Sequence, residues 1–338
     1  MKTLLLLLLF PISLFAQQTR LSEDNTKLKY ANTITANNLK DYLYVLASDS
    51  LQGRETGTAG QIDAANYIAS FFKEIGIPPY KYNTYFQKFK VRLVKHYGKQ
   101  NKKNDKKYVK GENIIGFIEG SDLKDEIIVI TAHYDHLGVK EDTLIYNGAD
   151  DNGSGTSAIM EIAQAFMLAK KEGNGPRRSI LIMPVSGEEK GLLGSKYYTE
   201  NPIYPLENTI ANLNVDMIGR IDKNHDNPDY VYLIGSDRLS SELHQISEDI
   251  NKQYFNLELD YTFNAEDDEN RYYFRSDHYN FAKNNIPVIF YFNGIHEDYH
   301  KPTDTIEKIN FEKIQKISRY IFLTAWELAN RDERPRLD

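Results

Sequence analysis

The sequence has no cysteine among its 338 residues. Without cysteine the chain can form no disulfide, can bind no metal through a thiolate, and can carry no lipid on a cysteine side chain. Core burial must therefore stabilise the fold. Hydrophobic residues make up 41% of the sequence, which at this length is enough for one large domain with a substantial core, or at most two.

A long basic tract is also absent, and the formal net charge is −7. Nucleic-acid binding depends on neutralising phosphates with basic side chains, so nucleic acid is not an expected partner. The lysines between Lys99 and Lys110 are the one local exception. Asparagine and aspartate interrupt them and strand-like runs flank them, so this segment is predicted to be a solvated hairpin loop.

A membrane-spanning run is missing beyond the N-terminus, because no later segment approaches the roughly 18 uninterrupted apolar residues that a transmembrane helix needs. The N-terminus itself carries Lys2, an apolar run over 4–10 and a small residue, Ala16, which is the layout of a secretory signal peptide. We expect residues 1–16 to be removed and residues 17–338 to form a single exported domain, periplasmic or secreted. A retained N-terminal anchor is the alternative.

Short β-branched runs alternate with longer amphipathic runs, a pattern typical of helices packed on a largely parallel sheet. The predicted strands are 127–131, 179–185, 210–215 and 288–292. The predicted helices are 61–75, 156–171, 239–255 and 311–330. The sequence shows no internal repeat and no linker long enough to mark a second domain, so we expect one α/β domain.

Polar, ionisable residues follow each of the four predicted strands. In open α/β sheets, ligands bind beyond the carboxyl ends of the strands, where the loops converge. One cleft could therefore contain side chains from all four loops, namely His133, Glu188, Glu189, Asp216 and His300.

Several of these residues stand in pairs that suit a metal site. His133 is followed two residues later by Asp135, which could hydrogen-bond the ring nitrogen that does not bind metal. Asp150 and Asp151 lie together in the glycine-rich turn 147–155. Such a turn could bind a phosphate or simply cap the following helix, but two adjacent carboxylates favour a cation.

The paired glutamates that follow the second strand can divide two roles. One carboxylate can bind metal while its neighbour takes a proton from water, as metal-assisted hydrolysis requires. Asp216 repeats the pattern of an acid at the end of an apolar strand, and His300 stands between Tyr299 and an acid four residues later, Asp304. Each of these residues taken alone could be an ordinary polar residue at a strand end.

Six motifs in a fixed order give the sequence a family resemblance. In chain order they are AHYDH, NGADDNGSG, SGEE, NVDMIGR, RSDHYNF and DYHKPTDT, and the segment 51–60 (LQGRETGTAG) precedes them. Together they resemble the M28 family of zinc peptidases, which includes bacterial secreted aminopeptidases and glutamate carboxypeptidase II. The resemblance covers residues 39 to 328. It implies a three-layer α/β/α fold around a central mixed, mostly parallel sheet.

The resemblance also implies a set of metal ligands. His133 and Asp216 would bind one zinc ion, Glu189 and His300 would bind the second, and Asp150 would bridge the two. Ligands of this type, nitrogen and carboxylate oxygen, are also compatible with manganese or cobalt.

The same resemblance implies roles for residues around the metals. Glu188 would act as general base and acid, and Tyr299 would donate its hydroxyl to the developing oxyanion. Asp135 and Asp151 would support the ligands from outside, with a cis peptide between Asp150 and Asp151. Candidate substrate contacts are Arg275 and His278, and the stretch 258–273 is expected to build the pocket for the first substrate residue.

The other histidines are weighed separately. We expect His136 to take a neighbouring hydrogen-bonding role rather than to bind metal. His296 lies four residues before His300, but Gly294 and Asp298 disfavour a helix there, so we leave it out of the ligand set. No role is assigned to His96, His225 and His244.

The sequence therefore predicts hydrolysis of peptide bonds, with removal of N-terminal amino acids by a water that two zinc ions activate and Glu188 deprotonates. Peptides are the expected substrates. Dipeptidase and carboxypeptidase activities stay open, as do the preferred side chain and the oligomeric state. One alternative reaction is glutaminyl cyclisation, which would use a single zinc ion. Another alternative is a binding module that keeps the fold without the chemistry.

Overall fold

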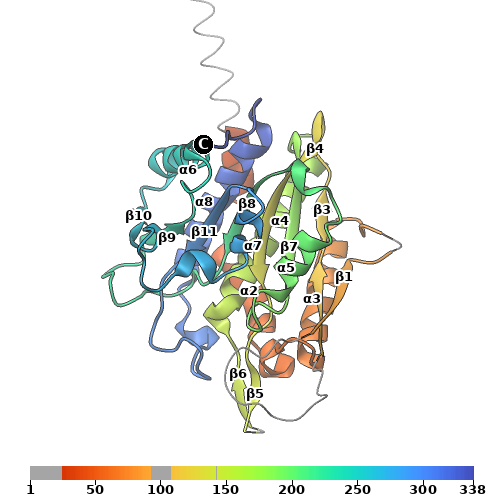
Figure 1. Cartoon of the computed structure of the whole chain (residues 1–338), viewed down its shortest axis with the longest axis vertical. Coiled ribbons are helices and arrows are strands. Elements are labelled where there is room, and N and C mark those ends of the chain that lie inside the picture. Colours follow the sequence, from red (N-terminus) through yellow and green to blue (C-terminus); the bar gives the residue numbers. More distant parts are fainter. Residues whose placement is uncertain (1–24, 82, 93–107, 142) are drawn as a thin grey trace, which may run out of the picture.

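The computed structural model describes residues 25–81, 83–92, 108–141 and 143–338. A seven-stranded sheet runs through its centre in the order β10-β9-β11-β8-β4-β7-β3 (Figure 1). The bounds of these strands in chain order are β3 Gly116–Ile118, β4 Leu123–His133, β7 Arg178–Val185, β8 Thr209–Val215, β9 Tyr230–Ile234, β10 Glu258–Asp260 and β11 Val288–Phe292. All four predicted strands are present, and β4 extends beyond the predicted 127–131 at both ends.

The sheet is mixed and mostly parallel, as predicted. β4 pairs parallel with β7 and β8, β8 pairs parallel with β11, and β9 pairs parallel with β10. Only the pairs β11–β9 and β3–β7 run antiparallel among these described strands. The carboxyl ends of β4, β7, β8 and β11 consequently lie at the same edge of the sheet.

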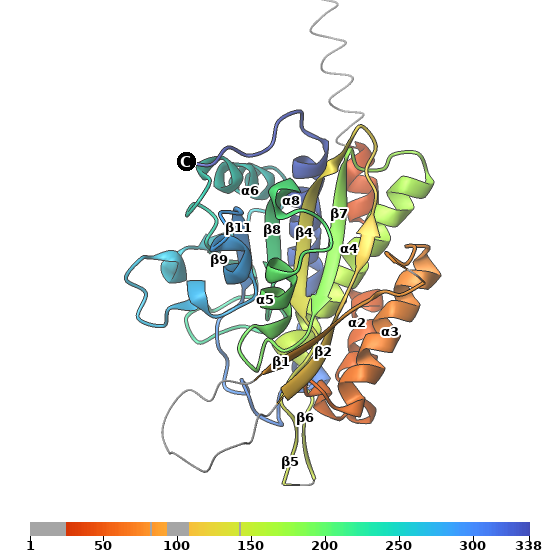
Figure 2. The ribbon, with the colours of Figure 1, turned by 45° about the vertical axis from the view of Figure 1, so that its right-hand side comes forward.

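Both faces of the sheet are covered because its central strands are apolar on both sides. In β4, Ile128 and Ile130 belong to the larger core cluster, whereas Ile127 and Val129 point into the second cluster. This alternation is the two-residue period of a strand. The structure is thus the predicted three-layer α/β/α sandwich, and Figure 2 shows helices on either side of the sheet.

The helices divide between these two layers. Those of the larger cluster are α2 Ala36–Leu46, α3 Ala59–Ile75, α4 Gly155–Lys171, α6 Ser241–Tyr254 and α8 Phe311–Asn330. The short helices α5 Leu193–Glu200 and α7 His278–Ala282 cover the opposite face. The four predicted helices correspond to α3, α4, α6 and α8, with ends that agree within two residues.

Two hairpins extend from this sandwich. β1 (Phe86–Arg92) pairs antiparallel with β2 (Tyr108–Ile114), which agrees with strands flanking the predicted lysine-rich loop, although residues 99–107 of that loop lie outside the described residues. β5 (Gly138–Lys140) pairs with β6 (Leu144–Tyr146). None of the described helices is long and apolar enough to cross a bilayer. The predicted signal peptide, residues 1–16, also lies outside the described residues and stays a prediction.

One buried acid joins two helices of the larger layer. Glu161, in the middle of α4, is 1% exposed, and its Oε2 accepts hydrogen bonds from Thr35 N at 3.2 Å and Asn38 Nδ2 at 3.4 Å at the start of α2. Burial raises the pKa of Glu161 to about 7. Because the unfolded chain titrates this group at a lower pH, the folded state holds an extra proton between those two values.

The structure therefore predicts that stability falls as the pH rises through this window. The stabilisation that the protonated Glu161 side chain gives to the folded state is complete below the pKa of the unfolded chain. It is lost as the pH rises through the folded-state pKa of about 7. Glutamine does not titrate, so only the wild type should lose stability between pH 4.5 and pH 8. The free energy of unfolding of Glu161→Gln minus that of wild type should therefore be larger at pH 8 than at pH 4.5, by roughly 1–3 kcal/mol. Urea unfolding at both pH values measures the difference, with Glu200→Gln on the exposed side of α5 as the control. An equal effect of Glu161→Gln at both pH values would contradict the assignment.

Candidate metal centre

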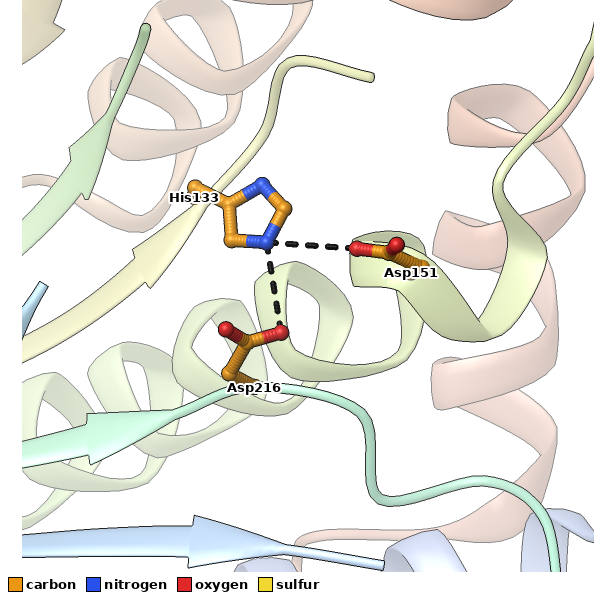
Figure 3. Close-up of side chains that lie close together, drawn as sticks. All are labelled: His133, Asp151 and Asp216. Atoms are coloured by element: carbon orange, nitrogen blue, oxygen red, sulfur yellow. Dashed lines mark hydrogen bonds and ion pairs between the residues drawn. The ribbon is translucent and has the colours of Figure 1, made fainter. Parts of the chain in front are cut away.

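A cluster of ionisable side chains lies at the carboxyl ends of β4 and β8. β4 ends at His133, and Asp216 directly follows β8. His133 Nε2 lies 3.2 Å from Asp216 Oδ1 and 3.3 Å from Asp151 Oδ1 (Figure 3). Asp151 belongs to the turn Ala149–Ser154 that leads into α4. Three segments distant in sequence therefore meet at one imidazole nitrogen.

A second imidazole faces the other oxygen of Asp151. His300 Nε2 lies 3.1 Å from Asp151 Oδ2 and 3.3 Å from Glu189 Oε2. Asp151 thus directs one oxygen to each of two imidazoles. Each imidazole also has a carboxylate of its own, Asp216 beside His133 and Glu189 beside His300. This is an arrangement in which one carboxylate can bridge two cations.

The protonation of His133 indicates what these atoms can hold. Its Nδ1 lies 3.0 Å from the main-chain oxygen of Asp135, which can only accept, so Nδ1 carries a proton. If the ring is neutral, Nε2 directs a lone pair toward two carboxylate oxygens. If the ring is protonated, its one N–H can point well at only one of these oxygens. A cation placed among the three atoms would satisfy them all.

The spacing of the cluster fits a zinc ion. Two ligand atoms at the corners of a tetrahedral shell with zinc bonds near 2.0–2.1 Å are separated by about 3.3 Å. The four nitrogen-to-oxygen distances of the cluster run from 3.1 to 3.3 Å. The donor set, with imidazole and carboxylate and no thiolate, is also one that zinc accepts.

The electrostatics of the cluster favour positive charge at the same places. Burial alone would lower the pKa of His133, but the carboxylates of Asp216 and Glu188 raise it well above its usual value. Burial also opposes the protonated form of His300, yet its hydrogen bonds with Asp151 and Glu189 raise the pKa of His300 to about 10. A divalent cation would displace these protons, so metal binding at this site should release protons.

The structure corrects the prediction for Asp150. Its Oδ1 accepts a hydrogen bond of 2.6 Å from Gly219 N and its Oδ2 lies 3.2 Å from His296 Nε2, so it contacts neither imidazole of the cluster. Adjacent side chains of a turn leave the backbone in different directions, and the backbone angles decide which one faces the cleft. The carboxylate that faces both imidazoles is that of Asp151, for which the sequence predicts a supporting position outside the ligand set. The cis peptide is likewise Asp151–Asn152, one residue beyond the predicted bond.

Asp135 supports the site through a contact other than the predicted one. The ring of His133 hydrogen-bonds its main-chain oxygen, whereas its carboxylate Oδ1 lies 3.8 Å from Nδ1. That carboxylate accepts hydrogen bonds from Thr56 Oγ1 at 2.5 Å and from the main-chain nitrogen of Glu188 at 3.2 Å. Asp135 therefore holds the loop that carries the paired glutamates.

Two supporting residues were missed in the sequence. Ser276 donates its hydroxyl to Asp216 Oδ2 at 2.6 Å, which fixes the oxygen that does not face His133. Arg54 is buried and donates to the main-chain oxygens of Tyr134 at 2.7 Å and Gly148 at 3.0 Å. The available signals were the places of Ser276 in the RSDH motif and of Arg54 in the segment 51–60.

Glu188 and Tyr299 line the cleft beside the cluster. Among the described residues, two groups of side chains lie close enough together to hold a metal ion, namely His133, Asp151 and Asp216, and His136, Asp151 and Glu189, and neither Glu188 nor Tyr299 belongs to them. Burial raises the pKa of Glu188 well above its usual value, so this carboxyl holds a proton more readily than an exposed glutamate does. Burial also raises the pKa of Tyr299, so its phenol keeps the proton and can donate it. The Tyr299 ring stacks on His300 with centroids 3.9 Å apart.

An apolar wall lines the same cleft as this cluster. The wall consists of Met217, Tyr272, Phe290, Phe292 and Ile295. Within the stretch 258–273 that was expected to build the pocket, Tyr272 lines the cleft. Arg275 is exposed and also lines the cleft, so it stays a candidate substrate contact.

His278, the second predicted substrate contact, does not line this cleft. Its side chain is fully buried, and its ring stacks on Phe290 with centroids 4.7 Å apart. Burial lowers its pKa to about 3, so the ring is neutral. The prediction is wrong because a ring enclosed in the core cannot reach a molecule bound in the cleft.

His136 takes a supporting position beside Glu189. Its Nδ1 lies 2.9 Å from Glu189 Oε1, the oxygen that does not face His300, and 3.7 Å from Asp151 Oδ2. The predicted neighbouring role, rather than metal binding, stays a prediction. His136, Asp151 and Glu189 also form the second group of potential metal ligands, so the ring lies at the edge of the cluster.

The remaining histidines lie elsewhere. His296 Nε2 lies 3.2 Å from Asp150 Oδ2, and its exclusion from the ligand set stays a prediction. His225 pairs with Asp222 at 2.7 Å, and His244 lies 3.0 Å from Ser236 Oγ. His96 lies outside the described residues.

Comparison with known proteins agrees with this geometry. The model of peptidase family M28 matches residues 113–325, which is more than half of the chain. This chain belongs to peptidase family M28.

Among relatives of this M28 chain, aminopeptidase YwaD of Bacillus subtilis is 26% identical over 233 residues, covering 67% of this chain and 46% of the relative. The match therefore spans about half of the relative's length. The solved LapA aminopeptidase of Legionella pneumophila has a TM-score of 0.70 at 24% identity, covering 92% of this chain and 75% of that chain. Glutaminyl cyclase of Porphyromonas gingivalis has a TM-score of 0.65 at 19% identity, covering 86% and 98%. The likenesses to LapA and to the glutaminyl cyclase concern the fold alone. Proteins with different described activities therefore share this fold.

The corrected position of Asp151 in this M28 chain can be tested by zinc binding. Asp151→Asn should lower zinc affinity by about 1,000-fold or more, because it removes an oxygen from both groups of ligands. Asp150→Asn should lower it by only about 10- to 100-fold, as expected for a residue outside the ligand set. Competition with a chromophoric chelator measures both affinities. A larger loss in Asp150→Asn than in Asp151→Asn would restore the original assignment.

Proposed function

We propose that this chain is a zinc metallopeptidase that removes N-terminal amino acids from peptides with two metal ions. His133 and Asp216 would hold one ion, Glu189 and His300 would hold the other, and Asp151 would offer one oxygen to each. The observation that carries the proposal is the division of the Asp151 carboxylate, one oxygen 3.3 Å from His133 Nε2 and the other 3.1 Å from His300 Nε2. The names of relatives that are zinc metalloproteases and aminopeptidases support it.

The residues beside the ions have separate roles in hydrolysis. Ions held at this cluster supply activation of a water molecule and polarisation of the scissile carbonyl. Glu188 takes the proton of the attacking water and passes it to the leaving amine, and its raised pKa suits both transfers. Tyr299 keeps its proton and donates a hydrogen bond to the oxygen that becomes negative.

The lining of the cleft suits binding of the side chain beside the cleaved bond. The cluster and the apolar wall both line it. The apolar wall can receive that side chain, and Arg275 lies at the exposed side of the cleft.

Glu188→Gln tests the assigned base. The amide cannot accept the proton of the water, so kcat should fall by about 10²- to 10⁴-fold, whereas zinc content should stay at the wild-type level. Glu189→Gln is the matched neighbour and should instead weaken zinc binding. Steady-state kinetics and elemental analysis of both variants give the comparison. Full turnover by zinc-loaded Glu188→Gln would exclude Glu188 as the base.

The type of cleavage is tested with a mixed library of peptides. Mass spectrometry of the products should show stepwise loss of N-terminal residues, and a chelator should abolish it because the ions activate the water. Peptides with a blocked N-terminus serve as the control and should stay intact. Loss of C-terminal residues, release of pyroglutamyl peptides or cleavage unaffected by the chelator would overturn the proposal.

A further inference from the structure

Asp304 holds the turn that carries the bridging carboxylate. It is fully buried four residues after His300, and its two oxygens accept hydrogen bonds from Asp150 N at 3.1 and 3.0 Å and from Asp151 N at 3.1 Å. The main-chain oxygen of Asp304 also accepts a hydrogen bond from Ala149 N at 3.2 Å. The loop that supplies one imidazole is therefore fixed directly to the turn that supplies the bridge.

Asp150 fixes the same turn to a third loop. Its Oδ1 accepts a 2.6 Å hydrogen bond from Gly219 N, three residues after Asp216, and its Oδ2 lies 3.2 Å from His296 Nε2, four residues before His300. Gly219 is needed for this approach, because a Cβ atom there would lie 2.9 Å from Asp150 Oδ1.

Asn152 completes the connection on the other side of the bridging residue. Its side chain donates to Val215 O at 2.8 Å and accepts from Met217 N at 3.1 Å, so it holds the main chain on both sides of Asp216. The side chains before and after Asp151 thus both contact the loop that carries Asp216.

We propose that Asp150 and Asp304 act as positioning residues that set the distance between the two metal-binding imidazoles. The proposal deepens the two-metal function and rests on it. Asp304 joins the His300 loop to the Asp151 turn, and Asp150 joins that turn to the Asp216 loop. Together they join three ligand-bearing segments that lie beyond the ends of the sheet strands, while their own hydrogen bonds go to main-chain N–H groups rather than to ligand atoms.

The physical reason is the geometry of a bridge. Asp151 can serve both ions only if the ligands on each side stay within a few tenths of an ångström of their places, since metal–ligand bond lengths vary little. Carboxylates that accept main-chain N–H groups fix a loop more firmly than neutral acceptors do. Residues that orient metal ligands from behind typically contribute about 10- to 100-fold to metal affinity.

The test is the zinc affinity of purified full-length variants, measured by chelator competition, together with the melting temperature of the metal-free protein. Asp304→Asn should lower zinc affinity by about 10- to 100-fold. Gly219→Ala alters no ionisable group, but its added methyl group pushes on Asp150 Oδ1. It should lower zinc affinity by about 10-fold, the lower end of the range for a positioning residue. Asp222→Asn is the control, because Asp222 is another buried carboxylate that accepts a main-chain N–H, but its hydrogen bonds stay within the segment after β8 and β9 and do not join two ligand-bearing segments. It should leave zinc affinity within about threefold of wild type, below the range for a positioning residue.

The possible outcomes separate the two proposals. Zinc affinities within threefold of wild type in both Asp304→Asn and Gly219→Ala would overturn the positioning role, even if the metal-free proteins melt at lower temperatures. An equal loss in Asp222→Asn would also overturn it, because the effect would then be a general one of removing buried charge. If Asp304→Asn does not fold, Gly219→Ala decides alone. Failure of the wild-type chain to bind zinc would instead contradict the proposed function.

Discussion

The structure depends on one carboxylate group that serves two sides of a cleft. Asp151 directs Oδ1 to His133 and Oδ2 to His300, and each imidazole has another carboxylate beside it. Carboxylates buried this close together repel one another and are costly to desolvate unless positive charge lies between them. The fold brings them together because the carboxyl ends of β4, β7, β8 and β11 meet at one edge of the sheet. Positive charge at this edge, on the imidazoles or on bound cations, makes this concentration of acids stable.

The sequence predicted the scaffold well because the scaffold follows from local patterns. The apolar runs of β7, β8 and β11 and the amphipathic patterns of α3, α4, α6 and α8 were each found close to their observed ends. The position of the ligands at strand ends followed from the general behaviour of open α/β sheets. His133 and His300 therefore lie together as expected, although 166 residues lie between them in the sequence.

The errors concern which way a side chain points from a turn or from the start of a short helix. The pair Asp150–Asp151 announces a metal site, but the sequence does not specify which carboxylate enters the cleft, since this depends on the backbone angles of the turn. His278 stands in a motif near the site and yet its ring enters the core against Phe290. The role of Asp304 was equally hidden, because its partners are main-chain N–H groups that any sequence would provide.

The family fold and the site carry different information about function. Proteins described as aminopeptidases and a glutaminyl cyclase share this fold, so the fold alone does not determine the reaction. The presence of two ligand groups around Asp151, with Glu188 free beside them, is what favours hydrolysis with two ions. The most direct measurement is anomalous diffraction at the zinc edge from crystals of the wild-type protein grown with zinc. Two peaks roughly 3.5–4 Å apart, one on each side of the Asp151 carboxylate, are predicted. A single peak, or a peak between Asp150 and His296, would contradict the account.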